Sequence, residues 1–249
     1  MAREYGSKGW VGVCPPQANP TVEAEMGVCL PEGITMLTAR LTSTSPDPRQ
    51  RMQDYYDRLD QTLNAYDTLP LDAVAFACTA SSYLVGLERE NTEIAALSKT
   101  RGYPIVTGGQ AIVAALRALK VKRLAIGAPY PAWVLDACRA YYTSAGFEIV
   151  AMKQIVTRTT DTRTIYELCS DDAIAAAAEL DISNADCVVF TGSGMPTLRA
   201  IKAVGERTGL PTLGTNLCLA WQVNEILKLP KAAGPHPLFN GWQDRIGRL

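Results

Sequence analysis

The sequence predicts an α/β protein of two pseudo-symmetric Rossmann-like (flavodoxin-like) domains, with parallel sheets and a site in the cleft between the domains. Short apolar runs that are bounded by turn residues and followed by helical segments are typical of buried parallel strands. One such run, 73–77, leads from Asp72 into Cys78 and a series of small hydroxyl residues. The same pattern returns at 186–194, which indicates a duplicated βα unit.

The repeat has a nearly constant offset along the chain. Asp72 and Asp186 each precede an apolar strand and are 114 residues apart. The Gly-x-Pro segments that open the next strand, 102–104 and 209–211, are 107 residues apart, so a short insertion or deletion lies between the two landmarks. Two related α/β halves explain this spacing better than two unrelated domains. We assign residues 1–120 plus about 225–249 to the first half and residues 121–224 to the second.

Each half contains four expected strands and several expected helices. In the first half, apolar or β-branched runs bounded by turn residues predict strands at 10–14, 34–41, 73–77 and 104–106, and helices at 49–66, at 86–100 and up to 119. The same patterns in the second half predict strands at 123–127, 147–153, 187–190 and 211–213, and helices at 132–144, 171–180, 196–208 and 217–227.

We expect the polar loops 42–48 and 157–163 to close over a substrate. The tail after Pro230 is expected to pack on the surface or on a partner.

Composition excludes several classes of function. Basic and acidic residues nearly cancel, 24 against 25, so no charge pattern indicates a nucleic-acid or membrane partner. No apolar run approaches the ~20 residues that span a bilayer, and the first residues lack the apolar core of a signal peptide. Seven cysteines without CxxC spacing indicate the reducing cytoplasm rather than disulfides or a zinc site. The single histidine, His236, argues against histidine triads and histidine-rich metal sites. A homo-oligomer is possible, because most oligomers of soluble proteins are assembled from identical chains.

Cys78 is the main candidate for chemistry. It follows a predicted strand and precedes a helix, where ligands bind in open α/β sheets and where a thiolate is favoured by nearby N–H groups. The alternative is that Cys78 is a buried small apolar residue, as cysteines often are. Cys29 has no motif around it, and we expect the remaining cysteines to be core residues: Cys14, Cys138, Cys169, Cys187 and Cys218.

Other small polar residues could bind a carboxylate beside Cys78. Thr79, Ala80 and Ser81 follow the cysteine, and their hydroxyl and N–H groups could hold a carboxylate or an enolate; helix capping is the alternative role. At the matching place in the second half, Gly192, Ser193 and Gly194 could form a second cradle. This Gly-Ser-Gly segment lacks the third glycine of a dinucleotide-binding fingerprint.

Two further residues end the first strand of each half. Asn19 and Tyr130 are placed to point into the cleft, where an amide or a phenol could orient a carboxylate. An interface position without a catalytic role is the alternative for Tyr130. Pro15 and Pro16 stiffen the loop before Asn19 and could form a wall of the pocket.

Four motifs in this order resemble the aspartate/glutamate racemase superfamily, in its maleate isomerase and arylmalonate decarboxylase branch. They are the segments 11–19, 77–79, 128–130 and 192–198, which extend over nearly the whole chain. The resemblance implies a small mono- or dicarboxylate substrate, bound between the two domains, and cysteine chemistry without a cofactor. It implies that Cys78 matches the nucleophile of maleate isomerases and that Asn19 matches their N-terminal asparagine. Tyr130 resembles a tyrosine shared with the decarboxylases, and Pro15, Pro16 and Thr79 resemble the decarboxylases' loop and oxyanion-hole positions.

The chain departs from this family pattern at Gly192. Racemases and maleate isomerases resemble each other in having a second cysteine there, and arylmalonate decarboxylases have their only catalytic cysteine there. Racemisation by two opposed bases is therefore disfavoured. One thiol suffices for decarboxylation of a substituted malonate with Cys78 as proton donor, and this is the leading interpretation. The alternative is a maleate-type cis–trans isomerase in which Cys78 is the covalent nucleophile and Tyr130 supplies the proton. A catalytically degenerate carboxylate-binding protein is a further alternative.

Overall fold

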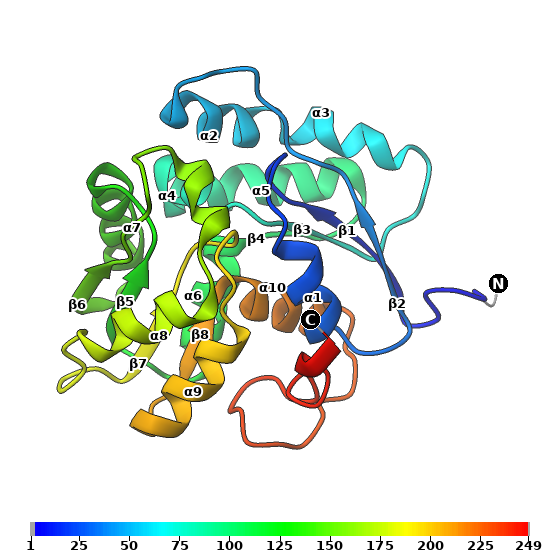
Figure 1. Ribbon diagram of the computed structural model, residues 1–249. Coiled ribbons are helices and arrows are strands. Elements are labelled where there is room, and N and C mark those ends of the chain that lie inside the picture. The colour runs from blue at the N-terminus through cyan, green and yellow to red at the C-terminus, as the bar shows by residue number, and fades with distance from the viewer. Residues whose placement is uncertain (1–2, 249) are drawn as a thin grey trace.

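The structure is a computed structural model in which residues 3–248 are described, and it contains two four-stranded sheets whose strands are all parallel (Figure 1). The first sheet has the order β2-β1-β3-β4 and consists of β1 (Gly9–Cys14), β2 (Ile34–Thr38), β3 (Ala73–Phe76) and β4 (Ile105–Thr107). The second has the order β6-β5-β7-β8 and consists of β5 (Arg123–Ala128), β6 (Glu148–Gln154), β7 (Cys187–Phe190) and β8 (Thr212–Gly214). The predicted fold class is confirmed, with the flavodoxin-like strand order in each half.

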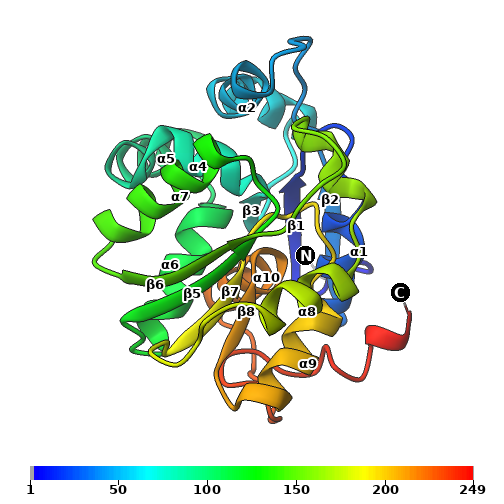
Figure 2. The ribbon, with the colours of Figure 1, turned by 60° about the vertical axis from the view of Figure 1, so that its left-hand side comes forward.

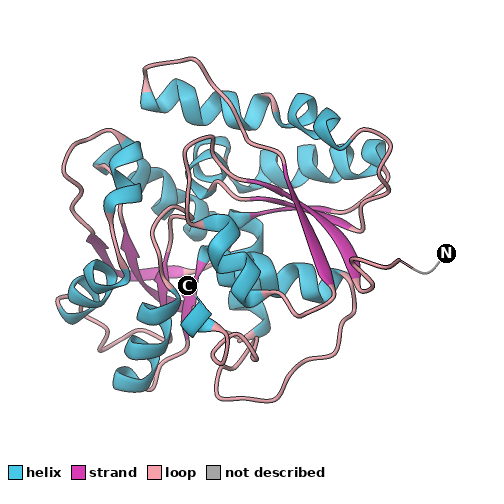
Figure 3. Cartoon of the chain, turned by 45° about the vertical axis from the view of Figure 1, so that its right-hand side comes forward, coloured by secondary structure: helices cyan, strands magenta, loops and turns pink. Residues whose placement is uncertain are grey.

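Helices flank both sheets (Figure 3). Those that precede β5 in the chain are α1 (Val22–Cys29), α2 (Pro48–Asp57), α3 (Leu59–Leu63), α4 (Thr79–Val85), α5 (Leu87–Arg101) and α6 (Gly108–Ala118). Those that follow it are α7 (Ala132–Ser144), α8 (Ser170–Ala178), α9 (Leu198–Thr208) and α10 (Thr215–Ile226). Short 3₁₀ helices are η1 (Asn64–Tyr66), η2 (Thr162–Glu167) and η3 (Ile246–Arg248). Among these elements, α10 packs against α6 and α1, and α4 packs against α7. The assignment of residues 1–120 plus about 225–249 and 121–224 to separate domains stays a prediction.

The two acidic residues of the repeat have the same structural role. Asp72 accepts a hydrogen bond from the backbone N–H of Trp10 at 2.7 Å, and Asp186 accepts one from the N–H of Arg123 at 2.9 Å. Each carboxylate also pairs with an arginine side chain, Arg3 or Arg123. In each half, the acid immediately before one strand (β3 or β7) is therefore bonded to the start of the neighbouring strand (β1 or β5).

Some predicted boundaries were wrong around the helices of the first half. The predicted helix 49–66 is three pieces, α2, α3 and η1, because the backbone of Arg58 leaves helical geometry (φ −99°, ψ 11°). The hydroxyl-rich residues after Cys78, which lie before the helix predicted at 86–100, form α4. Gly86, with φ +83°, then separates α4 from α5, a conformation that favours glycine. Helix α1 was not predicted, and β2 ends at Thr38 rather than at residue 41.

In the second half, α9 begins at Leu198 rather than at Pro196, because Thr197 is the N-cap.

The C-terminal tail packs back on the protein, as expected, and lies below α1 in Figure 1. Trp242 is 1% exposed, and the Arg245 guanidinium donates to the carbonyl oxygens of Val28 and Cys29 at 2.8 and 3.0 Å. These contacts anchor the tail to the end of α1.

The seven cysteines are all free thiols, and six of them are buried. Cys169 is the exception: it was expected in the core but is exposed at the start of α8, because its backbone lies outside the helix that it caps.

Between residues 3 and 248 no helix has the length and apolar character needed to cross a membrane.

Candidate active site

The loops that follow the central strands of the two sheets meet around one small cavity. Its volume is about 40 Å³, room for roughly three water molecules. Nine of the residues expected at the site line it: Pro16, Asn19, Cys78, Thr79, Ala80, Tyr130, Gly192, Ser193 and Gly194. Two do not line it. Pro15 pairs through its carbonyl with Leu41 N–H, and Ser81 lies behind the cysteine, in contact with its sulfur.

Cys78 is the N-cap residue of α4 and is only 6% exposed. Burial raises the pKa of its thiol, and this effect outweighs the groups that lower it. Those groups are the Ser81 hydroxyl, the backbone N–H groups of Ser81 and Ala80, and the charge of Arg51. A thiolate favoured at neutral pH, which the sequence position suggested, is therefore not what the surroundings produce. The resting thiol is protonated.

The Ser81 hydroxyl lies between the Cys78 thiol and helix α2. Its oxygen lies 3.0 Å from Cys78 Sγ and 2.7 Å from the carbonyl oxygen of Met52 in α2. A hydroxyl has one proton to donate. It can therefore donate to Met52 while the thiol is neutral, and must turn towards the sulfur to stabilise a thiolate.

Tyr130 and Thr79 form a hydrogen bond between the two halves, with 2.8 Å between their hydroxyl oxygens. Tyr130 is 4% exposed, and burial raises its pKa well above the ordinary value, so the phenol keeps its proton. A protonated phenol beside a second hydroxyl can donate to a carboxylate, an enolate or a carbanion. The structure thus places a proton donor in the cavity that holds Cys78.

Asn19 and Ser193 make hydrogen bonds within the protein. The Ser193 hydroxyl donates to the Ala77 carbonyl at 2.6 Å, and the Asn19 side-chain amide donates to the Ser193 oxygen at 3.3 Å. The Asn19 carbonyl oxygen accepts from the N–H groups of Thr21 and Val22 at the start of α1. These two side chains hold the loops of the two halves together at the edge of the cavity. The Ser193 hydroxyl is not a free donor for an anion.

Gly192 has a conformation and surroundings that favour glycine. Its φ is +114°, and a Cβ added there would lie 3.1 Å from Cγ and Cδ of Pro129 and 3.4 Å from the Tyr130 hydroxyl. The Tyr130 hydroxyl therefore lies beside the position that a second-half cysteine would require.

Six further residues line the cavity, and of these only Thr162 belongs to a segment, 157–163, that was expected near the substrate: Arg51, Met52, Tyr55, Thr162, Ile165 and Tyr166. The first three come from α2 and the others from η2, two segments that lie close together above the strands in Figure 2. The Arg51 guanidinium is buried and donates through Nη2 to Asp161 Oδ1 at 2.9 Å and Thr162 Oγ1 at 3.1 Å. The polar run 157–163 is thus partly at the cavity, whereas no residue of 42–48 lines it. An arginine in a polar helix indicates solvent exposure, so the sequence contained no signal for Arg51.

A larger groove of about 930 Å³ lies between α1, α9 and the C-terminal segment, away from Cys78. Its buried acid, Glu25, already accepts hydrogen bonds from the N–H groups of Thr197 and Leu198 and from the Asn216 amide. These bonds cap α9 and leave the carboxylate no evident chemical role. We therefore place the candidate active site in the smaller cavity.

A protein-family model described as arylmalonate decarboxylase matches residues 11–239 of the chain. The chain belongs to this family. Its relatives include maleate isomerases: the enzyme from Geobacillus stearothermophilus is 25% identical over 235 residues, which cover 88% of this chain and 92% of the relative. The maleate isomerase of Nocardia farcinica is also 25% identical, over 238 residues that cover 89% of this chain and 91% of the relative. The resemblance stated from the motifs is confirmed.

Solved structures of both kinds of family member have the same fold. Maleate isomerase from Pseudomonas putida S16 superposes with a TM-score of 0.85 at 21% identity, covering 94% of this chain and 98% of that one. A maleate isomerase variant from Nocardia farcinica with a covalently bound succinylcysteine intermediate has a TM-score of 0.78 at 21% identity, covering 89% and 93%. An arylmalonate decarboxylase has a TM-score of 0.70 at 18% identity, covering 95% and 99%. The family's shared architecture therefore accommodates both reactions.

Proposed function

We propose that this family member catalyses the cis–trans isomerisation of a small, maleate-like cis-dicarboxylate, with Cys78 as nucleophile and Tyr130 as proton donor. The observation that best supports the proposal is that these two groups line the same cavity. The thiol comes from the first half, and the phenol lies beside Gly192, the position equivalent to Cys78 in the second half. A nucleophile and a separate acid are what addition to a double bond requires.

The reaction proceeds by addition, rotation and elimination. After its proton is lost to solvent, the Cys78 thiolate forms a C–S bond to one alkene carbon, and the π electron pair moves to the other carbon. That carbon takes the proton of the Tyr130 phenol, whose oxygen keeps its hydrogen bond to Thr79. The new single bond rotates. The phenolate then removes the proton, the electron pair re-forms the double bond in the trans geometry, and the thiolate leaves.

The comparisons support isomerisation over the decarboxylation that was the leading interpretation of the sequence. The relatives at 25% identity from two bacteria are both maleate isomerases. The succinylcysteine in the Nocardia farcinica structure is the kind of adduct that addition of a cysteine thiolate to maleate would give.

Decarboxylation of a substituted malonate is the second candidate. The absence of a cysteine at Gly192 favours it, because one thiol is enough to protonate one face of an enediolate. The paired Thr79 and Tyr130 hydroxyls, 2.8 Å apart, could hold the enediolate oxygens.

Proton NMR of the purified protein with maleate, phenylmalonate and methylmalonate in D₂O tests both candidates. We expect fumarate from maleate, and a rate at least about a thousandfold lower for Cys78→Ala, because the nucleophile is lost. Cys169→Ala is the matched control and should keep wild-type activity, since this exposed thiol does not line the cavity. Deuterated monoacids without fumarate would instead favour the decarboxylase. Turnover by Cys78→Ala at the wild-type rate would exclude both roles proposed for Cys78.

A further inference from the structure

We infer that Arg51 binds the second carboxylate of the substrate, so that the site selects short dianions over monoanions of the same size. This inference rests on the proposed function for the identity of the substrate. It concerns the opposite end of the substrate from the carbon that Cys78 attacks, and it can be tested by binding alone.

The Arg51 side chain is built into the cavity wall but is only partly used by the protein. Its side chain is 2% exposed, and the Nη2 group makes both of the hydrogen bonds to Asp161 and Thr162. The Nη1 group is buried and donates to no acceptor among residues 3–248. Buried polar groups without a partner are rare, and a buried charge is costly unless it is paired. An unpaired guanidinium nitrogen in the wall of a cavity therefore indicates an anionic ligand.

The charges around the cavity also favour an added anion. Asp161 is the only acidic group in contact with Arg51 among the described residues, and it is shared with Arg163, which donates to both of its carboxylate oxygens. The hydrogen bond from Arg163 is the largest cause that holds the pKa of Asp161 at about 2. Within the described range 3–248, no aspartate or glutamate lines the cavity. The positive charge of Arg51 is thus only partly compensated, and a substrate carboxylate would complete the compensation.

The position of Arg51 explains why arginine suits this role. Arg51 extends from α2, and its contacts with Asp161 and Thr162 connect that helix to the start of η2. A guanidinium can make these two bonds with one nitrogen and still present the other to a carboxylate. A lysine ammonium in the same place would have to exchange one set of contacts for the other.

Calorimetric binding of succinate and succinamate to the wild-type protein tests the inference without turnover. Succinate has two carboxylates and no double bond, and succinamate replaces one carboxylate by a neutral amide of nearly the same shape. We expect succinate to bind at least about tenfold more tightly, because a charge-assisted hydrogen bond to a buried partner is lost with the amide. Equal affinity of the wild-type protein for the two compounds would overturn the inference.

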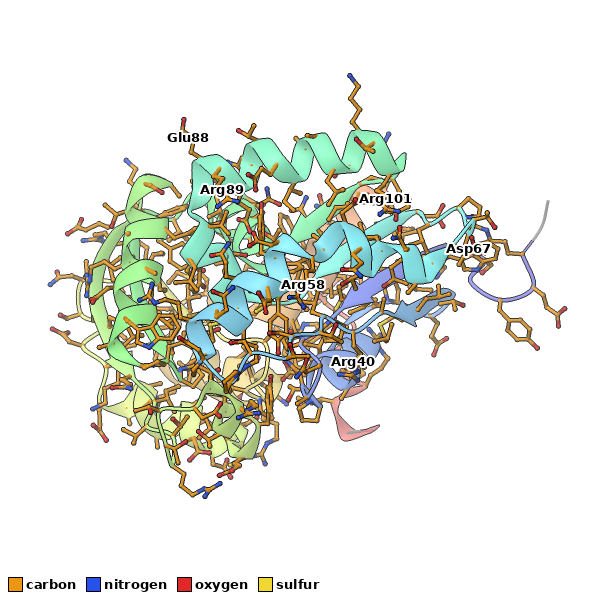
Figure 4. All side chains as sticks on the ribbon, turned by 90° about the horizontal axis from the view of Figure 1, so that it is seen from above. Arg40, Arg58, Asp67, Glu88, Arg89 and Arg101 are labelled. Carbon is orange, nitrogen blue, oxygen red and sulfur yellow. The ribbon has the colours of Figure 1, made fainter. Side chains whose placement is uncertain are left out.

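Substitutions assign the selectivity to this residue. Arg51→Met should bring the two affinities to within about twofold, and Arg51→Lys should retain a reduced preference for succinate. Arg58→Met is the matched control and should behave as wild type. Arg58, labelled in Figure 4, follows the same helix, but its side chain is 48% exposed and does not line the cavity. Full succinate selectivity in a folded Arg51→Met or Arg51→Lys protein would contradict the assignment. A protein that binds succinate selectively but makes no fumarate would refute the proposed reaction and leave Arg51 as the anion site.

Discussion

At the scale of single residues, Gly192 defines how this chain differs from its relatives' cysteine pattern. The sequence shows the absence of a second cysteine, and the structure shows that a side chain there would be strained. The φ of +114° is a region that L-residues rarely adopt, and a Cβ would lie only 3.1 Å from Pro129, which would have to shift slightly. The Tyr130 hydroxyl lies next to this space, and in the proposed reaction it supplies the proton.

Restoring a cysteine should therefore harm the protein rather than improve it. We expect Gly192→Cys to lower the free energy of unfolding by about 1–3 kcal/mol, because of backbone strain and the contact with Pro129. Urea denaturation measures this, and Gly192→Ala is the control, since it has the same strain without a thiol. A Gly192→Cys protein with wild-type stability and faster isomerisation would show that the second half can accept a cysteine acid.

At the scale of elements, the site depends on how α2 and α4 meet. The Ser81 hydroxyl of α4 lies within hydrogen-bond distance of both the Met52 carbonyl of α2 and the Cys78 sulfur. Formation of a thiolate would draw this hydroxyl away from α2. The protonation state of Cys78 is thereby coupled to the helix that supplies Arg51 to the cavity.

Ser81→Ala should shift the pH dependence of catalysis. The Ser81 hydrogen bond lowers the pKa of Cys78, so its loss raises that pKa further. In the proposed reaction the thiolate is the reactive form, so we expect kcat/KM to increase with pH through this pKa and the increase to occur at higher pH in the variant. Ser82→Ala is the matched control, because the Ser82 hydroxyl contacts the Cys78 carbonyl instead of its sulfur. An unchanged profile in Ser81→Ala would show that Ser81 does not act on the thiol.

At the scale of the whole molecule, a buried acid connects the two halves behind the site. Tyr141 of α7 donates to Glu90 of α5 at 2.5 Å, and Glu90 is fully buried. Burial raises the pKa of Glu90 above its ordinary value of 4.5. The folded protein therefore holds a proton at pH values where the unfolded chain has released it. This contribution to stability is complete below about pH 4.5 and decreases as the pH rises through the raised pKa.

Glu90→Gln should remove this pH dependence. The glutamine amide oxygen can still accept the Tyr141 hydrogen bond but does not ionise. We expect the stability of the variant relative to wild type to increase between pH 5 and pH 8, as measured by urea denaturation at several pH values. Glu93→Gln is the control on the same helix, since its side chain is exposed and pairs with Arg89. A constant difference between Glu90→Gln and wild type would mean that Glu90 has the same pKa in the folded and unfolded states.

Much of the fold could be predicted because its signals are local. An apolar run between turn residues identifies a buried strand without knowledge of its neighbours, and the repeated Asp72 and Asp186 identify equivalent strands in each half. The errors occurred where packing overrides local preference. Thr79, Ser81 and Ser82 are of types that favour caps and turns but lie in α4, because a buried helix against α2 and α7 satisfies their backbone groups. Cys169 is exposed because it caps a helix instead of lying within one.

The sequence by itself determined which apolar runs form strands, the duplicated halves, and nine residues that line the cavity at the carboxyl ends of strands, including Cys78 and Tyr130. These residues could be identified because the ends of parallel strands converge whatever the details of packing. Only the tertiary structure decided that Arg51 belongs to the same cavity, that burial keeps Cys78 protonated, and that Tyr130 lies beside Gly192. Burial and charge depend on groups that are distant in the chain, such as Asp161 beside Arg51, and therefore arise only when the two halves come together.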